Sequence, residues 1–444
     1  MCRRCLWHFR LYGDVMDLGP INVNIEGGMT YPFPPLIPVD QHFERKRLED
    51  IDAAVTGQLR QIPDADIAGK SIAITVGSRG IMGLVEITRA LVAGLRAKGA
   101  EPFIVPSMGS HGGATAEGQV AVLKGYGITE ESTGAEIRSS MEVVQIDALD
   151  DGTPLYIDRI ASEADGIVIA NKVKPHADFK AGYESGLVKM LCIGLGKHKG
   201  AVALHNHGFA RFHDILPKAG AKLLARLPVI FGLAILENAF DDLMEIEIIP
   251  RDRILEREKE LLEIAKASIG RLNFTDIDVL IVDEIGKNIS GEGMDPNVTG
   301  RPGSGLPGFD APNIQKIVAL DVTPQSHGNG VGIGSADLST RQCVEKIDLG
   351  AVYTNAITAT ILNPAKLPMV LNSDHDAIVV ALKTCNLTTP ETARIVRIKN
   401  TLEIHRIWVS PALLPHVEAS DRLSVAGPER PLVFDATGRL QAPE

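Results

Sequence analysis

The sequence predicts an α/β fold of two domains, each with a largely parallel sheet flanked by helices. The chain has 444 residues and 45% hydrophobic content, enough for more than one buried core. Apolar runs of strand length alternate with longer amphipathic stretches, and polar, glycine-rich turns follow several of these runs. Ligands of such sheets bind beyond the carboxyl ends of the strands. We therefore expect the active site in the cleft between the two domains.

The first domain is expected to span residues 31–270, after a poorly ordered leader at 1–30. Buried apolar runs predict its strands, and amphipathic stretches between them predict helices. The expected strands are 71–76, 102–106, 165–173 and 229–238, and the expected helices are 81–99 and a second one beginning near residue 115. A charged helix at 251–270, with apolar residues at helical spacing, leads out of this domain.

The second domain is expected to span residues 271–444 and to close over the cleft. A strand at 279–282 opens into a long loop rich in glycine and proline, and loops of that length usually have a function. Further strands are expected at 316–322 and 393–400, and helices at 341–347 and 374–385.

Composition excludes several classes of function. A formal net charge of -11 disfavours a broad nucleic-acid surface, because phosphate binding needs a basic face. No apolar run approaches the roughly 18 residues that span a bilayer, so we expect a cytoplasmic protein without membrane contact. The five cysteines are scattered, which predicts reduced thiols; Cys2 and Cys5 form a CxxC pair without a second pair at zinc-ribbon spacing. Small-molecule chemistry is the better prediction, and a homo-oligomer is compatible with it.

Two glycine-flanked turns follow buried strands of the first domain. GSRG carries Arg79, and GSHGG carries His111 next to Ser110. Glycine permits a tight backbone that approaches a ligand closely, and amides in such turns favour anions. The structural alternative is that the glycines only let strands meet helices.

The segment at 174–208 crowds four histidines and several lysines among small apolar residues. His176 follows a proline just after a strand, Lys189 is flanked by small residues, and His205 and His207 come next. Imidazoles bind borderline divalent metals or move protons near neutral pH, and a lysine amine can form a covalent link. HEXXH, a Walker phosphate loop and a GxSxG elbow are all missing, which disfavours their classes of enzyme.

Polar side chains on loops of the second domain are candidates for substrate binding. Lys287 follows a buried strand, Arg301 ends GEGMDPNVTGR, and His327 lies in SHGNGVGIGSAD. Such groups could hold an acid and exclude water when the domains close. Ordinary surface turns are the structural alternative.

The order GSHGG, PH, AGYESGLVK and ALHNHG resembles the nickel-dependent lactate racemase family over roughly residues 70–270. The resemblance implies a nickel-pincer nucleotide, pyridinium-3,5-bisthiocarboxylic acid mononucleotide nickel, attached covalently through Lys189. It implies His205 as the nickel ligand, with His207 as the alternative. Cofactor-biosynthesis proteins would then mature the chain.

The same resemblance assigns the remaining first-domain candidates. His111 and His176 would be two proton-transfer bases, and Arg79 and Ser110 would help to hold the cofactor. The implied activity is racemisation or epimerisation of a 2-hydroxy acid by hydride transfer to and from the pyridinium ring. Because Gly112 stands where lactate racemases have an arginine, and their substrate contacts in the second domain are missing, a larger or sugar acid fits better than lactate.

Two other classes of function remain open at this stage. The same histidines could hold a simple divalent ion in a hydrolase or lyase, with Lys189 binding substrate. Alternatively, the chain could bind the cofactor or an anion without catalysis.

Overall fold

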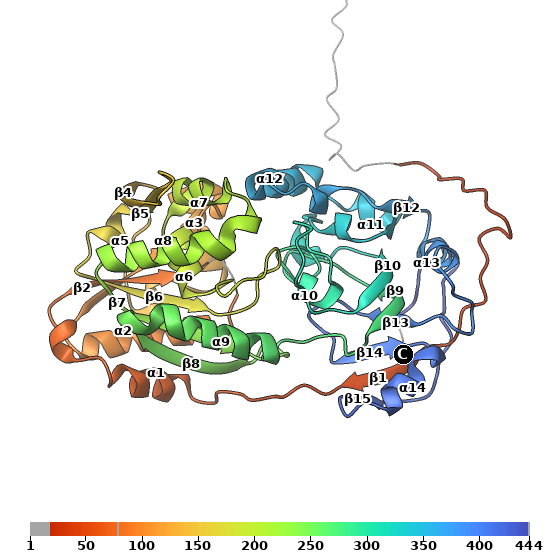
Figure 1. Ribbon diagram of the computed structural model, residues 1–444, viewed down its shortest axis with the longest axis horizontal. Coiled ribbons are helices and arrows are strands. Elements are labelled where there is room, and N and C mark those ends of the chain that lie inside the picture. The colour runs from red at the N-terminus through yellow and green to blue at the C-terminus, as the bar shows by residue number, and fades with distance from the viewer. Residues whose placement is uncertain (1–17, 78–79, 443–444) are drawn as a thin grey trace, which may run out of the picture.

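The computed structural model describes residues 18–77 and 80–442 and contains two large mixed sheets (Figure 1). The five-stranded sheet has the order β3-β2-β6-β7-β8, in which all neighbours are parallel except β7 and β8. Its strands are β2 (Ser71–Val76), β3 (Glu101–Pro106), β6 (Gly166–Lys172), β7 (Val229–Glu237) and β8 (Leu243–Pro250).

Helices cover both faces of this sheet because its strands are apolar on both sides. Ile72 and Ile74 pack against α1 and α2, whereas Ala73 between them points to the opposite core with α6 to α9. The helices are α1 (Ile51–Leu59), α2 (Leu84–Ala97), α3 (Ala116–Gly125), α4 (Glu130–Thr133), α5 (Arg159–Ser162), α6 (Leu187–Lys189), α7 (Lys197–His205), α8 (Phe212–Arg226) and α9 (Ile254–Ser268). A single π-helical turn, Met190–Gly194, joins α6 to α7.

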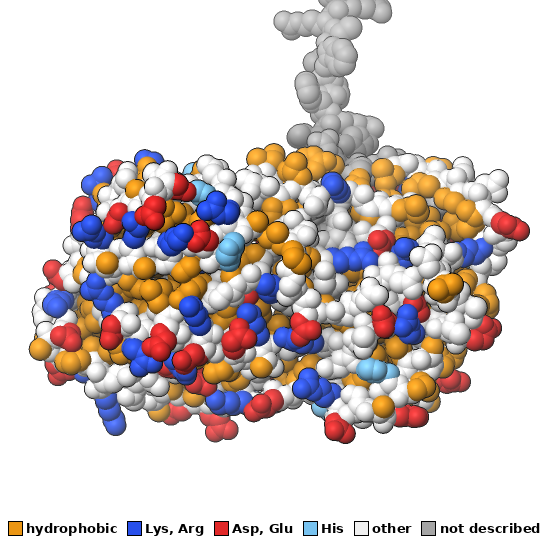
Figure 2. Space-filling model, in the orientation of Figure 1, with side chains coloured by type: hydrophobic (Ala, Val, Ile, Leu, Met, Phe, Trp, Pro, Cys, Tyr) orange, Lys and Arg blue, Asp and Glu red, His pale blue; other side chains and the backbone are white. Residues whose placement is uncertain are grey.

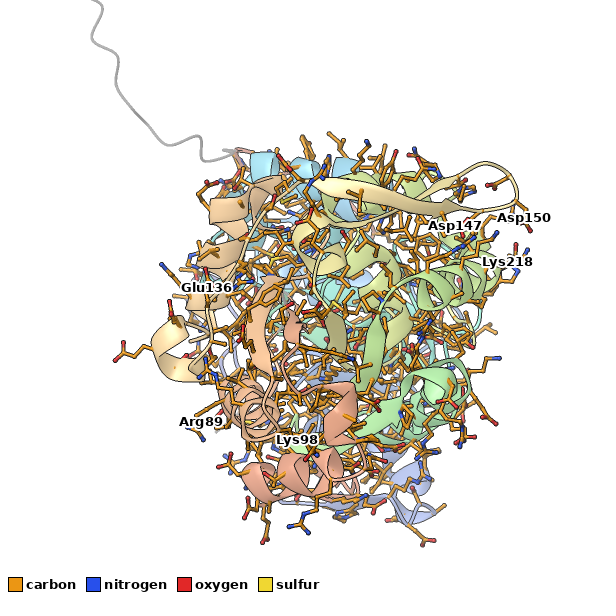
Figure 3. The ribbon with its side chains drawn as sticks, turned by 90° about the vertical axis from the view of Figure 1, so that its left-hand side faces the viewer. Arg89, Lys98, Glu136, Asp147, Asp150 and Lys218 are labelled. Carbon is orange, nitrogen blue, oxygen red and sulfur yellow. The ribbon has the colours of Figure 1, made fainter. Side chains whose placement is uncertain are left out.

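A two-stranded hairpin, β4 (Val143–Ala148) and β5 (Pro154–Asp158), packs against α7 and α8 in the half that contains the five-stranded sheet. Figure 3 shows Asp147 and Asp150 near its tip, on the side of α8. Ion pairs attach the tip to that helix: Asp147 to Arg226 at 3.3 Å and Asp150 to Lys222 at 3.3 Å. These exposed pairs orient the hairpin but contribute little stability.

The eight-stranded sheet has the order β12-β11-β10-β9-β13-β14-β1-β15, parallel as far as β13 and antiparallel beyond. Its strands are β1 (Ile37–Gln41), β9 (Asp276–Val282), β10 (Asn313–Ala319), β11 (Leu338–Thr340), β12 (Met369–Leu371), β13 (Ile395–Ile398), β14 (Arg406–Val409) and β15 (Leu423–Val425). Its helices are α10 (Pro296–Thr299), α11 (Arg341–Glu345), α12 (Leu349–Ala359), α13 (Asp374–Lys383) and α14 (Leu414–Glu418).

Two separate cores also cover the faces of this second sheet. Leu280 and Val282 belong to the core with α11, α12 and α14, and Val279 and Ile281 belong to the core with α13. Alternate residues of one strand therefore serve opposite faces, as period-two geometry requires.

The predicted fold class is confirmed: both sheets are mainly parallel and flanked by helices. The apolar runs at 71–76, 102–106, 165–173 and 229–238 became strands within one residue at most ends. The expected helix at 251–270 is α9, and charged side chains of both signs lie on the surface near it (Figure 2). The outer strands β8, β14, β1 and β15 run antiparallel to their neighbours, an arrangement that the local sequence patterns do not predict.

The domain boundaries at 30 and 270 stay a prediction, but one strand of the expected first domain belongs to the second sheet. β1 lies inside the segment 31–270, yet it pairs with β14 and β15 of the second sheet. Earlier residues lie on the same side of the molecule, since Ile21 exchanges two hydrogen bonds with Asn372 and the carbonyls of Glu26 and Gly28 accept from Lys383. Among the described residues, no helix is both long and apolar enough to cross a membrane.

Candidate active site

The loop after β6 is organised by one buried carboxylate, that of Glu184. Lys174 and Ser185 exchange backbone hydrogen bonds of 2.8 and 3.1 Å, which closes the loop on itself. Inside it, Glu184 is fully buried and accepts hydrogen bonds from the backbone of His176 at 2.7 Å and of Ala181 at 3.1 Å. Its charge is matched by Lys180 at 3.2 Å and Lys266 at 3.1 Å. The position of His176 is therefore set by backbone and charge together.

His176 is buried and oriented by its neighbours. Its ring packs 4.4 Å, centroid to centroid, from that of Phe179, and its Nδ1 accepts the backbone N–H of Asp178 at 2.9 Å. The other ring nitrogen is Nε2. That Nε2 contacts Nζ of Lys189. Burial, and next the charge of Lys189, hold the pKa of His176 well below its usual value, so the ring is neutral at pH 7.

Lys189 lies at the end of the short helix α6, and the start of this helix is fixed by a hydrogen bond to Glu258. The N–H of Val188 donates to Glu258 of α9 at 2.8 Å, and burial raises the pKa of Glu258 to about 8. A Cβ added at Gly186 would lie 2.3 Å from the Glu258 carboxyl, which explains the glycine before this helix. The backbone thereby directs the Lys189 amine to His176.

His205 completes this cluster from the last residue of α7. Its Nδ1 donates to the carbonyl of Ala201 at 2.7 Å, and Phe209 and Phe212 pack on the ring at 5.5 and 5.4 Å. Burial and, to a smaller extent, the charge of Lys189 lower its pKa to about 4, whereas the hydrogen bond to Ala201 opposes this shift. Because Nδ1 donates, Nε2 keeps its lone pair, as a histidine that ligates a metal requires.

His207, the alternative ligand, points elsewhere. Its Nε2 lies 2.8 Å from the hydroxyl of Thr153, and its Nδ1 lies 3.9 Å from Asp151, both next to hairpin β4–β5. The geometry therefore favours His205 over His207 as a partner of His176 and Lys189.

The turn that carries His111 is attached to the same region. His111 is exposed, Ser110 is half-buried, and the N–H of Gly109 donates to the carbonyl of Gly194 at 3.1 Å, five residues beyond Lys189. Gly109, Gly112 and Gly113 all have φ near +65°, which explains the glycines of GSHGG. Arg79, like the CxxC pair of Cys2 and Cys5, lies outside the described residues.

Asp178 was not singled out from the sequence, although it lies at the centre of the cluster. Its Oδ2 is 3.8 Å from Nδ1 of His176, and its buried Oδ1 has no hydrogen-bond partner among the described atoms. Burial raises its pKa to about 6, and the charges of Lys189 and Lys287 oppose that rise. The sequence signal that could have found it is its position, two residues after the Pro-His pair.

Of the second-half candidates, Lys287 is associated with the cluster through Asp178. Its Nζ also donates to the carbonyl of Gly291 at 2.8 Å. Arg301 is engaged elsewhere, by Asp337 at 2.5 Å and by the carbonyls of Ile314 and Gln315 at 2.9 and 3.2 Å.

His327 is exposed and ends a 3-10 turn with φ of 48°. Among the interactions of the described residues, none joins Arg301 or His327 to His176.

The second half contacts the His176 loop directly. Asn297 of α10 accepts from Lys180 at 2.6 Å, and Ser304 donates to the carbonyl of Asp178 at 2.5 Å. The Lys180 amine also lies 4.4 Å from the ring centroid of Phe309. The long glycine- and proline-rich loop therefore packs against the His176 loop. The sequence predicted a function for this long loop but not this contact.

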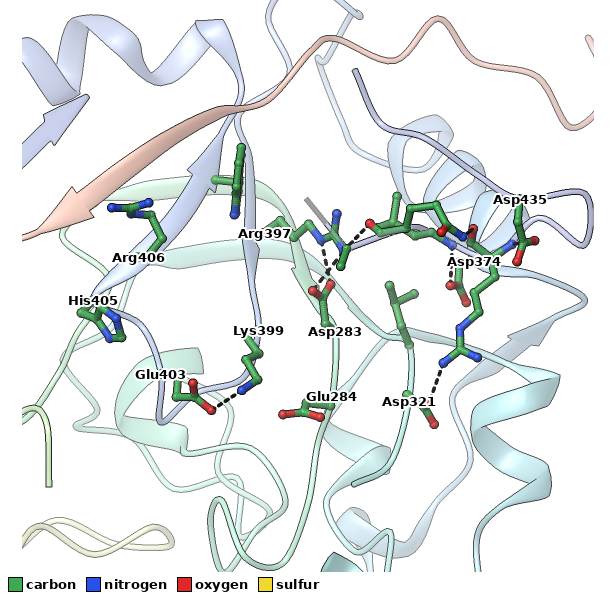
Figure 4. A pocket seen from close by; sticks show the side chains of 16 residues that line it. Asp283, Glu284, Asp321, Asp374, Arg397, Lys399, Glu403, His405, Arg406 and Asp435 are labelled. Atoms are coloured by element: carbon green, nitrogen blue, oxygen red, sulfur yellow. Dashed lines mark hydrogen bonds and ion pairs between the residues drawn. The ribbon is translucent and has the colours of Figure 1, made fainter. Parts of the chain in front are cut away.

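A cavity of about 750 Å³ lies elsewhere, at the carboxyl ends of β9, β10 and β13 (Figure 4). Most of its charges are already paired, as Arg397 with Asp283 at 2.8 Å, Arg439 with Asp321 at 3.1 Å and Lys399 with Glu403 at 2.7 Å. Within the part of the chain that the structure describes, no group of three or more His, Cys, Asp or Glu side chains is arranged to hold a metal ion.

Comparisons with known proteins show what this chain is similar to. Residues 49–214 match the family model of the lactate racemase N-terminal domain. The solved lactate racemase apoprotein from Thermoanaerobacterium thermosaccharolyticum is 15% identical, with a TM-score of 0.51, over 83% of this chain and 99% of that one. A protein from Thermotoga maritima is 14% identical, with a TM-score of 0.44, over 64% of this chain and 74% of that one. No curated protein matches the chain.

The matched segment includes every first-half candidate: it spans the turns of Arg79 and His111 and the cluster of His176, Lys189 and His205. The solved apoprotein shares the fold across both sheets. Residues 49–214 therefore resemble the lactate racemase N-terminal domain, and the chain shares the fold of the lactate racemase apoprotein.

Proposed function

We propose that the chain is a nickel-dependent racemase or epimerase of a 2-hydroxy acid. The observation that carries this proposal is the cluster of His176, Lys189 and His205, in which two neutral imidazoles lie beside one lysine amine. A neutral imidazole can accept a proton or ligate a metal, so the cluster offers a base at His176 and a metal ligand at His205.

The donor set fits a nickel-pincer nucleotide. A pincer brings its own soft ligands, so one protein imidazole is sufficient, and His205 offers Nε2 while its Nδ1–H is held by the carbonyl of Ala201. Lys189 offers a primary amine for the covalent link. When bound, such a cofactor supplies reversible acceptance of hydride from the Cα atom of the substrate.

The protein residues then have distinct tasks. His176 at Nε2 and His111 on its turn would each hold or release the hydroxyl proton of the substrate, one on either side. Lys287, beside Asp178, would attract the substrate carboxylate. Phe179, Phe209 and Phe212 form an aromatic wall around His176 and His205 that keeps water away.

The charge of Lys189 links attachment to proton transfer. In the structure this charge lowers the pKa values of both His176 and His205. Acylation of the amine removes the charge, so the pKa of His176 moves back toward its usual range. A base with a pKa nearer the working pH transfers protons more efficiently.

The substrate class follows from the polar groups around the cluster. The buried Oδ1 of Asp178 has no hydrogen-bond partner within residues 18–77 and 80–442, so it can accept a hydrogen bond from a substrate hydroxyl group, and lactate has no hydroxyl beyond C2. We therefore propose a larger, polar hydroxy acid, such as a sugar acid. The active site lies between the two sheets, where Asn297 and Ser304 contact the His176 loop.

The decisive experiment expresses the chain with cofactor-making proteins and measures intact mass and nickel. We expect one covalent adduct, mapped to Lys189, and about one nickel per chain. Single enantiomers of 2-hydroxy acids and aldonates are then incubated with this protein in deuterium oxide. Inversion with little deuterium at Cα supports hydride return, whereas full deuteration or an adduct-free polypeptide contradicts the proposal.

A further inference from the structure

Lys197 is a buried lysine for which the proposed reaction has no use. It is fully buried, and its ammonium lies 3.2 Å from the equally buried carboxylate of Asp158. Burial lowers the pKa of Lys197 and raises that of Asp158, and each partner's charge opposes the other's shift. Such a pair is costly to desolvate, so its geometry suggests a specific task.

The backbone of Lys197 is also unfavourable. Its φ is +53°, in the left-handed region that side chains with a Cβ avoid. It is the first residue of α7, where the helix dipole disfavours a positive charge. The tertiary contacts of the ammonium hold the residue in this conformation.

Those contacts join four segments of the first half. The ammonium donates to the carbonyl of Pro106 at the end of β3 and to Oε1 of Gln119 on α3 at 3.0 Å. Asp158 ends β5, and Lys197 itself begins α7, whose last residue is His205. One buried cation therefore connects the strand before the GSHGG turn with the helix of the proposed nickel ligand.

Gln119 links Lys197 to the GSHGG turn through hydrogen bonds. It is fully buried, and its Nε2 donates to the carbonyl of Gly109 at 2.9 Å and to that of His111 at 3.4 Å. Because Lys197 binds Oε1, the amide cannot flip without losing all three bonds. The turn also packs closely against α3, since a Cβ added at Gly112 would lie 2.6 Å from the backbone nitrogen of Gln119.

We propose that Lys197 is a positioning residue, which acts through Gln119 to fix the turn of His111 relative to α7 and His205. The part that concerns catalysis by His111 rests on the proposed function, whereas the placing of the turn does not. A displacement of a reacting group by about 1 Å can cost about 100-fold in rate, so the turn needs such support.

The first test substitutes Gln119→Glu, which keeps an oxygen for Lys197 but removes the amide that donates to the turn. Hydrogen exchange followed by mass spectrometry should show amides of residues 108–115 exchanging about 10-fold faster or more, with β6 unchanged. In the matured enzyme kcat should fall with little change in KM. Unchanged exchange in the turn would overturn the proposal. Lys199→Met, on an exposed neighbour of Lys197, is the matched control and should behave as wild type.

The second test separates positioning from general stability. Lys197→Met leaves Asp158 buried without its cation, so the melting temperature falls and the turn exchanges faster. The double variant Lys197→Met, Asp158→Leu removes the orphaned charge and should regain thermal stability while the turn still exchanges fast. If the turn recovers together with stability, Lys197 is only structural. If the matured protein racemises no hydroxy acid, the proposed function fails, but the exchange data still decide the role of Lys197.

Discussion

The predicted site residues His176, Lys189 and His205 lie together, whereas Arg301 and His327 of the second half lie apart from them. His176, Lys189 and His205 form one cluster in which two pKa values are depressed, and an oxygen of the neighbouring Asp178 has no partner among the residues that the structure describes. Arg301 instead donates to a carboxylate and three carbonyls, and His327 is exposed. Groups that folding leaves imperfectly matched are better candidates for chemistry than groups whose bonds are complete.

The cavity at the ends of β9, β10 and β13 teaches the same point. It is large, yet Arg397, Lys399 and Arg439 each have an acidic partner there (Figure 4). Size alone therefore does not identify the reactive site of this protein. The following substitutions test the contrast between the two halves.

The largest effect is expected from Lys189→Ala and Lys189→Arg. Neither variant has the primary amine of lysine, so the covalent adduct should be absent in both and racemisation should fall to background. Intact mass spectrometry after co-expression and chiral analysis measure these two outcomes. Arg keeps the charge, so an active Arg variant would show that charge and not attachment is needed. Lys199→Ala serves as the control.

The next effect separates His205 from His207. His205→Gln should lower nickel affinity more than about 100-fold, because even residues that only support a ligand cost 10- to 100-fold. His207→Gln should keep about one nickel per chain, since its ring contacts Thr153. Metal analysis of the two purified variants gives the answer. Equal loss in both would contradict the assignment, and the adduct at Lys189 should persist in either case.

Stability should depend on pH through the buried imidazoles. The pKa of His205 falls from 6.5 to about 4 in the folded, cofactor-free chain, so the unfolded state binds more protons between these values. Stability is therefore fully present above pH 6.5 and is lost as pH falls toward 4, by about 3 kcal/mol from this group. Urea unfolding across this range measures the slope. His205→Gln should flatten it, and an unaltered slope would show that other groups dominate.

Arg301→Met should affect stability more than activity. It removes hydrogen bonds to Asp337, Ile314 and Gln315, and the expected loss is about 2 kcal/mol in the free energy of unfolding. The KM of the matured enzyme should change by less than about 2-fold, because the guanidinium binds protein groups and not the substrate. The opposite pattern, a large rise in KM without a change in stability, would indicate that Arg301 binds the substrate.

The smallest effect is expected from His327→Gly. The residue is exposed with φ of 48°, a conformation that glycine adopts without a steric penalty. We expect a change of about 0.5 kcal/mol, toward higher stability, and unaltered kinetics. Thermal unfolding and steady-state assays test both. A clear loss of turnover would place His327 in the working site.

Much of the fold follows from local patterns. The strands around Ile72, Val168 and Leu280 and the helix that ends before Gly99 were predictable because strand and helix periodicities are local properties. The antiparallel outer strands were not, since pairing of β1 with β14 joins residues more than 360 positions apart. No short window of sequence contains that information.

The candidate site divides in the same way. His111, His176 and Lys189 stand out because each follows a strand or a glycine turn, and residues at one end of a parallel sheet converge. Asp178, Glu184 and Lys197 did not stand out, because their importance comes from burial next to partners in other segments. Arg301 was predicted to bind substrate, but in the folded chain its guanidinium donates to four groups, the carboxylate of Asp337 and the carbonyls of Ile314, Gln315 and Ser335.

By itself, the sequence determined the alternation of strands and helices, the glycine turns and the candidates for reactive side chains, because these depend on neighbours along the chain. Only the tertiary structure decided that His205 and not His207 joins Lys189, and that Lys197 and Asp158 are buried together. The physical reason is that solvation and pairing of a charged or polar group depend on everything packed around it, including segments far away in sequence.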